Sequence, residues 1–490
     1  MKSIGLCNFP SFQTTLSITD SQRKREMGKQ SADELHVLMF PYFAFGHISP
    51  FVQLSNRLSL HGLRVSFLSA PGNIPRIKSS LLLTPNVEII PISLPPVEGL
   101  PPGLDSTSEM TPHMAELLKK SVDLMQPQIK TLLSQLNPHF VFIDFAQYWL
   151  PKLASELGIK TVFFSVFSAI SGAFLTVPAR DPGDKMPTVE DLSKPPIGFP
   201  LTSVTYAQTF QARDFLYLFK SFDGNPGAYH RVSEGMSGCT ALAVKTCHEM
   251  EGPYVDFMKT EHQKPILLTG PLVPEPPTGE LEEKWAQWLS KFPSGSVIFC
   301  SFGSETFLDD SQIEELALGL ELTGLPFILV LKFPAGVDPQ TELNRTLPKG
   351  FLERVKDRGI VHSGWVPQLL ILANSSVGCY LCHSGFSSLI EGLVNDCQLV
   401  LLPLKGDQYL NSKVFAGDLN VGVEVKRRDE DGYFGKDDIN EAVRKVMMEI
   451  EKEPCKSIRS SHKKWKEFLL NKEIQNKFIT DMIKELKALA

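Results

Sequence analysis

Two polar residues in the first half of the chain have the chemistry of a general base and its partner. His47 follows a glycine in the loop after the apolar run of residues 35–40, and Asp144 directly follows the apolar run of residues 140–143. An imidazole, with an ordinary pKa of about 6.5, accepts protons near neutral pH. A carboxylate beside the ring fixes its tautomer and stabilises the imidazolium that forms. The pair predicts proton abstraction from a hydroxyl group.

A second set of polar residues lies at a predicted strand-to-helix turn in the other half of the chain. A strand is expected at residues 376–382, followed by a sharp turn and a helix from about residue 386 to 394. Small residues at a helix start expose backbone amides, which form an anion site together with the helix dipole. The dipole contributes only about 0.3–1 kcal/mol at an exposed site. A diphosphate site therefore needs further donors, and His383, Ser387 and Ser388 are placed to supply them.

Other polar and aromatic residues of the same segment suit the remaining parts of a nucleotide-sugar. Glu391 follows one helical turn later, where its carboxylate can accept hydrogen bonds from a ribose diol. Trp365 can stack on a base, which contributes about 1–3 kcal/mol. Asp407 and Gln408 follow an apolar strand and a proline, where the hydroxyls of a sugar need polar partners.

Short apolar runs alternate with segments of helical length from residue 35 onward, which predicts parallel sheets covered by helices in an α/β fold. The box Ser311-Gln-Ile-Glu314 predicts one helix start, and Asp438-Ile-Asn-Glu441 predicts another. The expected strands are residues 35–40, 63–68, 140–143, 161–166, 241–246, 296–301, 327–331, 376–382, 398–402 and 421–425.

The length and composition indicate a two-domain protein without a nucleic-acid partner. A chain of 490 residues is too long for one core, and the proline-rich stretch at residues 270–279 reads as a linker. The net charge of −6 argues against nucleic acid and against an anionic membrane surface. No apolar run reaches the length of a membrane-spanning helix, so no stable membrane insertion is expected.

The cysteines and the first residues predict a cytoplasmic location. The eight cysteines are scattered and mostly lie in apolar runs, as in a reduced intracellular protein. Residues 1–26 lack the apolar core of a signal peptide. We interpret them as a disordered extension with Met27 as the working start; a transit peptide is the alternative.

Three other readings of the sequence belong to different functional classes. The motif Cys379-x-x-Cys382-His383 matches c-type haem attachment, but it falls within an apolar strand. A catalytically silent nucleotide-sugar-binding protein would have no use for a poised base. A retaining phosphorylase would need a pyridoxal-binding lysine motif, which the sequence does not display. Neither half carries G-x-G-x-x-G after its first strand, which argues against a nicotinamide cofactor.

The segment from Trp365 to Gln408 resembles the 44-residue signature box of the plant secondary-product glycosyltransferases, the family 1 UDP-dependent enzymes. It begins with Trp, has Gln in fourth place, His in nineteenth place and Glu in twenty-seventh place, and ends in Asp-Gln. The resemblance extends to Ser301-Phe-Gly-Ser304, to Trp285 and Trp288, and to Gly270-Pro-Leu272. It covers essentially residues 35–490.

The resemblance implies a GT-B fold, in which two Rossmann-like doubly wound domains face each other across an interdomain cleft. The domain ranges expected are an extension at 1–30, an acceptor-binding domain at 31–269, a linker at 270–285, a UDP-sugar-binding domain at 286–465 and, at 466–490, a C-terminal helix that returns to the first domain. His47 would be the base and Asp144 its activating partner in an inverting transfer. The donor-binding residues would be Trp365 and Val366 for uracil, Gln368 and Glu391 for ribose, Ser304, His383 and Ser388 for the pyrophosphate, and Asp407 and Gln408 for the sugar.

By the same resemblance the UDP-sugar is a co-substrate, no cofactor or metal is needed, and the enzyme acts as a monomer on a small-molecule acceptor. The chain departs from the family at Phe386 and Ser387, where Trp and Asn are usual. Such departures resemble the branch that adds sugar to sugar, which predicts a flavonoid or terpenoid glycoside as acceptor. A bare aglycone is the alternative, and glucose, xylose, rhamnose and galactose all stay open as the donor sugar.

Overall fold

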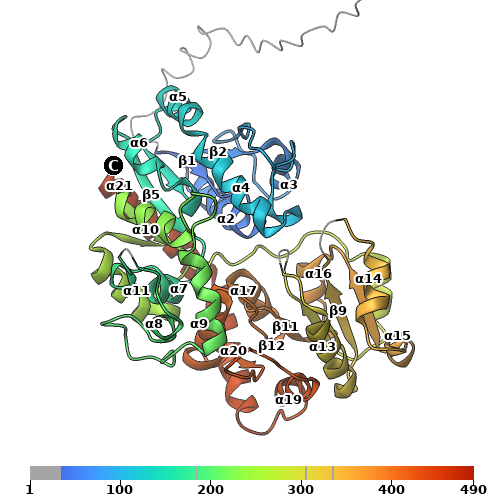
Figure 1. Cartoon of the computed structure of the whole chain (residues 1–490). Coiled ribbons are helices and arrows are strands. Elements are labelled where there is room, and N and C mark those ends of the chain that lie inside the picture. The colour runs from blue at the N-terminus through green and yellow to red at the C-terminus, as the bar shows by residue number, and fades with distance from the viewer. Residues whose placement is uncertain (1–34, 184, 304–305, 334–335) are drawn as a thin grey trace, which may run out of the picture.

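The computed structural model describes residues 35–183, 185–303, 306–333 and 336–490. These residues form two parallel β-sheets with helices on their faces, one sheet in each half of the chain (Figure 1). The first sheet has the order β3-β2-β1-β4-β5-β6-β7 and the second has the order β10-β9-β8-β11-β12-β13. The first-sheet strands are β1 His36–Phe40, β2 Arg64–Ser69, β3 Val87–Pro91, β4 Phe140–Ile143, β5 Lys160–Ser165, β6 Ala241–Val244 and β7 Ile266–Leu268. The second-sheet strands are β8 Val297–Ser301, β9 Phe327–Leu331, β10 Gly359–Ser363, β11 Val377–Cys382, β12 Gln398–Leu401 and β13 Gly422–Glu424.

All ten expected strands form, within two residues of their expected ends. Their continuous apolar sequences are explained by position, because helices cover both faces of each sheet and bury both rows of side chains. The strands that the sequence did not indicate are β3, β7 and β10, and each lies at an edge of its sheet. All three are only partly buried; β3 and β10 mix apolar and polar residues, and β7 is apolar but only three residues long.

The helices of the first half are α2 Phe45–Leu60, α3 Ile74–Lys78, α4 Pro112–Asp123, α5 Gln126–Leu136, α6 Leu150–Ser155, α7 Ala169–Leu175, α8 Val189–Ser193, α9 Thr209–Phe215, α10 Ala228–Gly238 and α11 His248–His262. Those of the second half are α12 Glu283–Leu289, α13 Asp310–Thr323, α14 Pro339–Thr346, α15 Phe351–Val355, α16 Gln368–Leu372, α17 Phe386–Val394, α18 Asp407–Lys413, α19 Lys436–Met447, α20 Cys455–Leu470 and α21 Lys472–Leu489. Short 3-10 turns lie at Pro71–Asn73, Thr107–Glu109, Phe145–Gln147, Pro178–Arg180 and Leu216–Phe219, and a π turn at Val414–Asp418.

Both predicted helix starts were wrong by two or three residues. Helix α13 is capped by Asp309, whose carboxylate accepts a hydrogen bond from the Gln312 amide at 2.8 Å. The side chain of Gln312 accepts in turn from the Asp309 amide at 3.1 Å. Helix α19 begins at Lys436, so Asp438 lies inside its first turn. At α13 the capping box is thus formed by Asp309 and Gln312, whereas at α19 Asp438 is the third helical residue and its carboxylate accepts a hydrogen bond from the Gly435 amide at 2.9 Å.

The last helix of the chain packs on the first sheet. Helix α21 contacts α2 and β7, and its residues Ile479, Met482 and Leu486 belong to the same apolar cluster as β1. The Lys160 ammonium donates hydrogen bonds to the carbonyl oxygens of the last two residues. The chain thus crosses twice between its halves, first before α12 and again after α20.

A further apolar cluster joins the two halves below the cleft. It includes Ile170 and Tyr254 from the first half and Leu389 and Leu410 from the second, all buried. Such shared burial fixes how the carboxyl ends of the two sheets face each other. Within the described parts of the chain, none of the helices combines the length and the apolarity needed to cross a membrane.

Candidate active site

The carboxyl ends of β1 and β4 bring His47 and Asp144 together. The two strands are neighbours in the first sheet, and helix α2 places His47 in its first turn. Asp144 directly follows β4 and is 2% exposed. The His47 Nδ1 atom lies 2.8 Å from the Asp144 Oδ2 atom. The sequence-predicted pair is therefore in hydrogen-bond contact.

The surroundings of Asp144 determine which ring nitrogen of His47 faces the cavity. Its carboxylate accepts hydrogen bonds from the backbone amides of Phe145 at 2.7 Å and Tyr42 at 3.2 Å. An acceptor held in this way favours the tautomer in which His47 Nδ1 carries the proton. The rings of Tyr42, Phe145 and Phe167 pack around the imidazole at centroid distances of 5.4–5.7 Å. In this tautomer Nε2 is the ring nitrogen that carries no proton, so it is the one that can accept a proton.

His47 and Asp144 line a cavity that is also lined by Gly406 and Asp407 of the second half and whose empty space, with the open solvent at its mouth, is about 950 Å³. Asp407, the first residue of α18, lines it together with His47 and Asp144. Most of the remaining wall is apolar, including Phe145, Phe163, Phe167, Leu175, Leu218, Val232 and Met236. The cavity thus combines a polar end with a large apolar body.

Asp407 is held by a residue that the sequence analysis did not indicate. The Asn411 Nδ2 atom donates hydrogen bonds to Asp407 at 2.9 Å and to the Ser384 carbonyl oxygen at 3.0 Å. The Asn411 carbonyl oxygen accepts a hydrogen bond from Ser168 of the first half at 2.5 Å. Burial raises the pKa of Asp407 to about 6. The spacing of four residues on one helix was the only signal in the sequence that pointed from Asp407 to Asn411.

The side-chain oxygen of Gln408 forms its hydrogen bonds within the protein. Its side-chain oxygen accepts hydrogen bonds from the backbone amides of Leu404 at 3.0 Å and Lys405 at 3.1 Å. Only the amide nitrogen of this side chain is left to contact a sugar. Gln408 therefore shapes the turn before α18 as well as lying beside Asp407.

The turn between β11 and α17 forms as expected, with the helix spanning Phe386–Val394. Ser384 has a positive φ of 63°, which exposes successive backbone groups at the start of the helix. Ser388 is buried in the first turn, and Ser387 is partly buried beside it. Phe386 is buried in the core.

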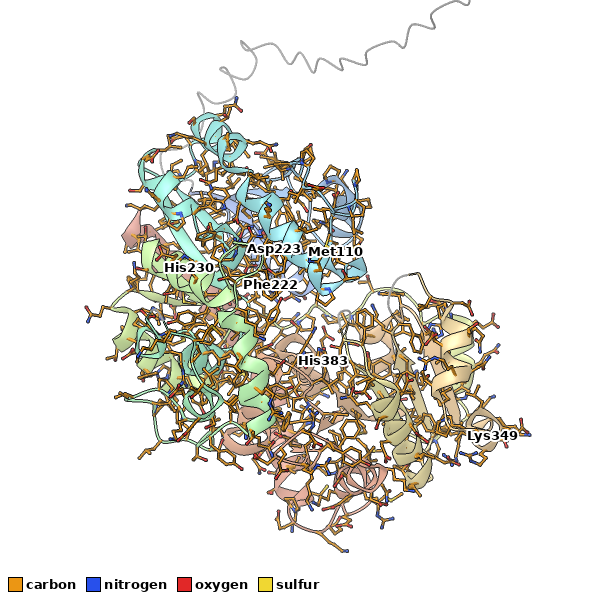
Figure 2. The ribbon with its side chains drawn as sticks, viewed as in Figure 1. Met110, Phe222, Asp223, His230, Lys349 and His383 are labelled. Atoms are coloured by element: carbon orange, nitrogen blue, oxygen red, sulfur yellow. The ribbon has the colours of Figure 1, made fainter. Side chains whose placement is uncertain are left out.

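His383 sits near the middle of the molecule, between two glycines (Figure 2). A Cβ atom on Gly385 would lie 2.6 Å from the His383 ring, and one on Gly303 would lie 2.9 Å from it. Burial lowers the pKa of His383 to about 4, so the ring is neutral at pH 7. Its Nδ1 atom is buried without a hydrogen-bond partner among the described residues. A ligand oxygen could satisfy this atom.

Gln368 and Glu391, the two residues predicted to bind the ribose, contact each other. The Gln368 side-chain amide donates a hydrogen bond to the Glu391 carboxylate at 2.6 Å, and its oxygen accepts from Ser301 at 3.2 Å. Trp365 follows β10 and is 71% exposed at the surface, while the neighbouring Val366 is buried. Ser304, which the resemblance assigned to the pyrophosphate, lies outside the described residues.

Two lysines of the first half also reach the site, and the sequence analysis did not indicate either. Lys119 of α4 lines the cavity and forms a buried ion pair with Glu116 at 2.7 Å. Lys245 follows β6 and donates a hydrogen bond to the Ser387 hydroxyl at 2.6 Å. Neither lysine belongs to a recognisable sequence pattern. Each comes close to the site only because the folded chain brings distant segments together.

The structure rules out the haem-attachment reading of Cys379, Cys382 and His383. Both thiols are fully buried in β11. Cys379 belongs to the apolar cluster on one face of the sheet, and Cys382 belongs to the cluster on the other face. Side chains three residues apart in a strand point in opposite directions, so the two thiols cannot bond to one haem.

Comparisons with known proteins agree with this geometry. Residues 278–465 match the family described as "UDP-glucoronosyl and UDP-glucosyl transferase". The chain is 64% identical to an anthocyanidin-3-O-glucoside rhamnosyltransferase of Petunia hybrida over 464 residues, covering 94% of this chain and 98% of the relative. It is 41% identical to a cyanidin 3-O-galactoside 2''-O-xylosyltransferase of Actinidia chinensis var. chinensis, covering 94% of this chain and 99% of the relative.

A solved structure shares the fold. The complex of Glycyrrhiza uralensis UGT73P12 with glycyrrhetinic acid 3-O-monoglucuronide superposes with a TM-score of 0.74 at 20% identity, covering 93% of this chain and 96% of that one. The two facing parallel sheets are those of the GT-B fold. High identity over nearly the full length of two curated relatives shows the family as well as the fold. The chain belongs to the plant family 1 UDP-dependent glycosyltransferases.

Proposed function

We propose that this enzyme transfers a sugar from a UDP-sugar to a sugar hydroxyl of a flavonoid glycoside, with inversion at the anomeric carbon and with His47 as the general base. The observation that carries the proposal is the cavity in which His47, Asp144 and Asp407 meet. A proton acceptor and a sugar-binding carboxylate from opposite halves of the chain there face the same space.

The proposed reaction follows from this arrangement. The His47 Nε2 atom takes the proton of the acceptor hydroxyl, and the hydroxyl oxygen forms a bond to the anomeric carbon. The bond between that carbon and the diphosphate oxygen breaks, and its electron pair leaves with UDP. Asp144 stabilises the imidazolium, which later releases its proton to solvent. Because the acceptor attacks on the side opposite the diphosphate, the configuration inverts.

The donor would lie along the carboxyl edge of the second sheet. Trp365 and Val366 would hold the uracil, Gln368 and Glu391 the ribose, and His383, Ser387 and Ser388 the diphosphate. A neutral His383, two hydroxyls and the start of α17 are suited to an oxyanion, and we propose that no metal ion takes part. One chain supplies both sides of the cleft, so we also propose a monomer. The free, buried cysteines among the described residues support a reducing compartment such as the cytoplasm.

The shape and lining of the cavity support a glycoside acceptor. Its apolar walls suit an aromatic body, while Lys119, Tyr217 and Thr176 add polar groups that a sugar can contact. The names of both relatives give a glycosylated anthocyanidin or cyanidin as the acceptor of those proteins. The donor sugar differs between them, so the relatives do not decide among the donor sugars.

A donor-by-acceptor screen tests the proposed function. Each UDP-sugar would be incubated with matched flavonoid aglycones and their 3-O-monoglycosides, and products would be read by mass. We expect a mass gain of one sugar on the monoglycosides and little or none on the aglycones. A mass gain restricted to aglycones would favour the alternative acceptor, and no turnover with any UDP-sugar would overturn the proposal.

The buried Asp407 predicts a pH dependence of donor binding. Because burial raises its pKa to about 6, the carboxylate is ionised above that pH and becomes protonated below it. An ionised carboxylate accepts hydrogen bonds from sugar hydroxyls better than a protonated one. We therefore expect the Kd for the UDP-sugar, measured by calorimetry, to rise as the pH falls from 7.5 to 5. The Kd for UDP should change much less. Asp407→Asn should remove the difference between the two ligands, and a parallel pH response of both would contradict the role given to Asp407.

A further inference from the structure

Lys245 is a buried cation of the first half that reaches the second half. It follows β6, at the carboxyl edge of the first sheet, and is 1% exposed. Its ammonium donates a hydrogen bond to the Ser387 hydroxyl in the first turn of α17 and lies 5.6 Å from the centre of the Phe386 ring. Among the described residues no carboxylate lies within ion-pair distance of it. Lys245 is thus held by a hydroxyl and an aromatic ring.

This environment is unfavourable for an ammonium. Removing a charge from water is costly unless an opposite charge compensates it. Burial accordingly lowers the pKa of Lys245 to about 8, and the charge of Glu391 opposes that shift. The start of α17 adds the positive end of a helix dipole, which repels a cation. A nearby anion would offset both the loss of hydration of the ammonium and its repulsion by the start of α17.

Other unsatisfied groups lie at the same turn. The His383 Nδ1 atom and the Ser384 hydroxyl are buried without hydrogen-bond partners among the described residues. Both precede the helix whose first turn carries Ser387. A cation, a helix N-terminus and two unpaired polar groups together suit an anion with several oxygens.

We propose that Lys245 binds the diphosphate of the UDP-sugar from across the cleft and stabilises its negative charge as the bond to the sugar breaks. The inference rests on the proposed function and adds a residue of the acceptor-side domain to the donor site. Its hydrogen bond to Ser387 holds the ammonium beside the anion site when no donor is present. The ammonium belongs to the first half and helix α17 to the second. Their positive charges therefore act on the same anion only where the two halves meet.

The decisive experiment compares ligands with and without the diphosphate. Calorimetry would measure the Kd for UDP and for uridine with the full chain and with Lys245→Met, which keeps an apolar stem and removes the charge. We expect the Kd for UDP to rise about 10- to 100-fold, as is usual when a charged hydrogen-bond partner is lost. The Kd for uridine should stay the same, and Lys245→Arg should restore most of the affinity for UDP.

A matched control removes the charge of a lysine that precedes the neighbouring strand β7. Lys264 donates to the carbonyl oxygen of Cys239, just before β6, and Lys264→Met should leave the Kd for UDP unchanged. Wild-type affinity for UDP relative to uridine should also fall above about pH 8, where Lys245 loses its proton, and this fall should be absent in Lys245→Arg. Glu391 is the carboxyl group whose charge acts on Lys245, and burial raises its pKa above the usual value.

Three outcomes would overturn the inference. These are an unchanged Kd for UDP in Lys245→Met, an equal loss for UDP and uridine, or the same pH response in the wild type and Lys245→Arg. The pH comparison uses folded protein even if the methionine variant does not fold. A wild-type chain that fails to bind UDP would overturn the proposed function itself, which distinguishes the two failures.

Discussion

Replacing His47 by alanine is expected to lower kcat by about 10²–10⁴-fold, which is the contribution usual for a positioned general base. The imidazole lines the cavity with its Nδ1 atom held by Asp144, so the variant loses the proton acceptor that this carboxylate orients. Initial rates at saturating UDP-sugar and acceptor measure the effect. The Kd for UDP should stay unchanged, because His47 is not among the residues proposed to bind UDP.

His61→Ala is the matched control for this variant. His61 lies at the other end of α2, is exposed, and is remote from the cavity. It should retain the wild-type rate. A fall of kcat in both variants would point to damage of α2, and an unchanged kcat in His47→Ala would remove His47 as the base.

The central strands could be predicted from the sequence because their apolar composition reflects their burial. A strand such as β1, HVLMF, is apolar throughout because helices cover both faces of its sheet. The edge strands β3 and β10 were missed because their sequences mix apolar and polar residues, and β7 was missed because its apolar run is only three residues long. Sequence pattern therefore indicated all the interior strands but only one of the four edge strands of the described sheets, β13.

Helix starts were harder to predict than helices. The bounds of α17 follow from a glycine turn and an apolar stripe, which leave few alternatives. In α13 several residues near the start can serve as caps, and Asp309 with Gln312 forms the box that Ser311 and Glu314 resemble. Competing caps of similar chemistry differ little in free energy, so a local pattern does not choose between them.

The contact between two site residues of the same signature segment could be predicted, whereas two hydrogen bonds between the halves of the chain were not. Gln368 and Glu391 belong to a single signature and meet in the structure. The contact of Lys245 with Ser387 spans 142 residues, and that of Ser168 with Asn411 spans 243. No periodicity or spacing rule links such positions. They meet because two sheets present their carboxyl ends to one cleft, which only the assembled fold specifies.

Asp144→Asn should be nearly as damaging as loss of the imidazole, with an expected fall of kcat of about 10²–10⁴-fold. In the native site both oxygens of Asp144 accept hydrogen bonds, one from Phe145 and the other from Tyr42 and His47. An asparagine supplies one oxygen and one amide group. If the amide faces His47, it donates to Nδ1, and the ring must carry its proton on Nε2. That nitrogen can then no longer accept a proton from the acceptor hydroxyl.

The opposite orientation of the asparagine brings its own cost, because the amide group would then face the Phe145 amide, donor against donor. Asparagine still caps the turn at Phe145–Gln147 about as well as aspartate does. We therefore expect the variant to fold, with a modest loss of thermal stability and an unchanged Kd for UDP. If the pair acts as one unit, the double variant His47→Ala/Asp144→Asn should be no slower than the worse single variant. Losses that multiply in the double variant would show that Asp144 acts independently of His47, and the mechanism proposed for the pair would then fail.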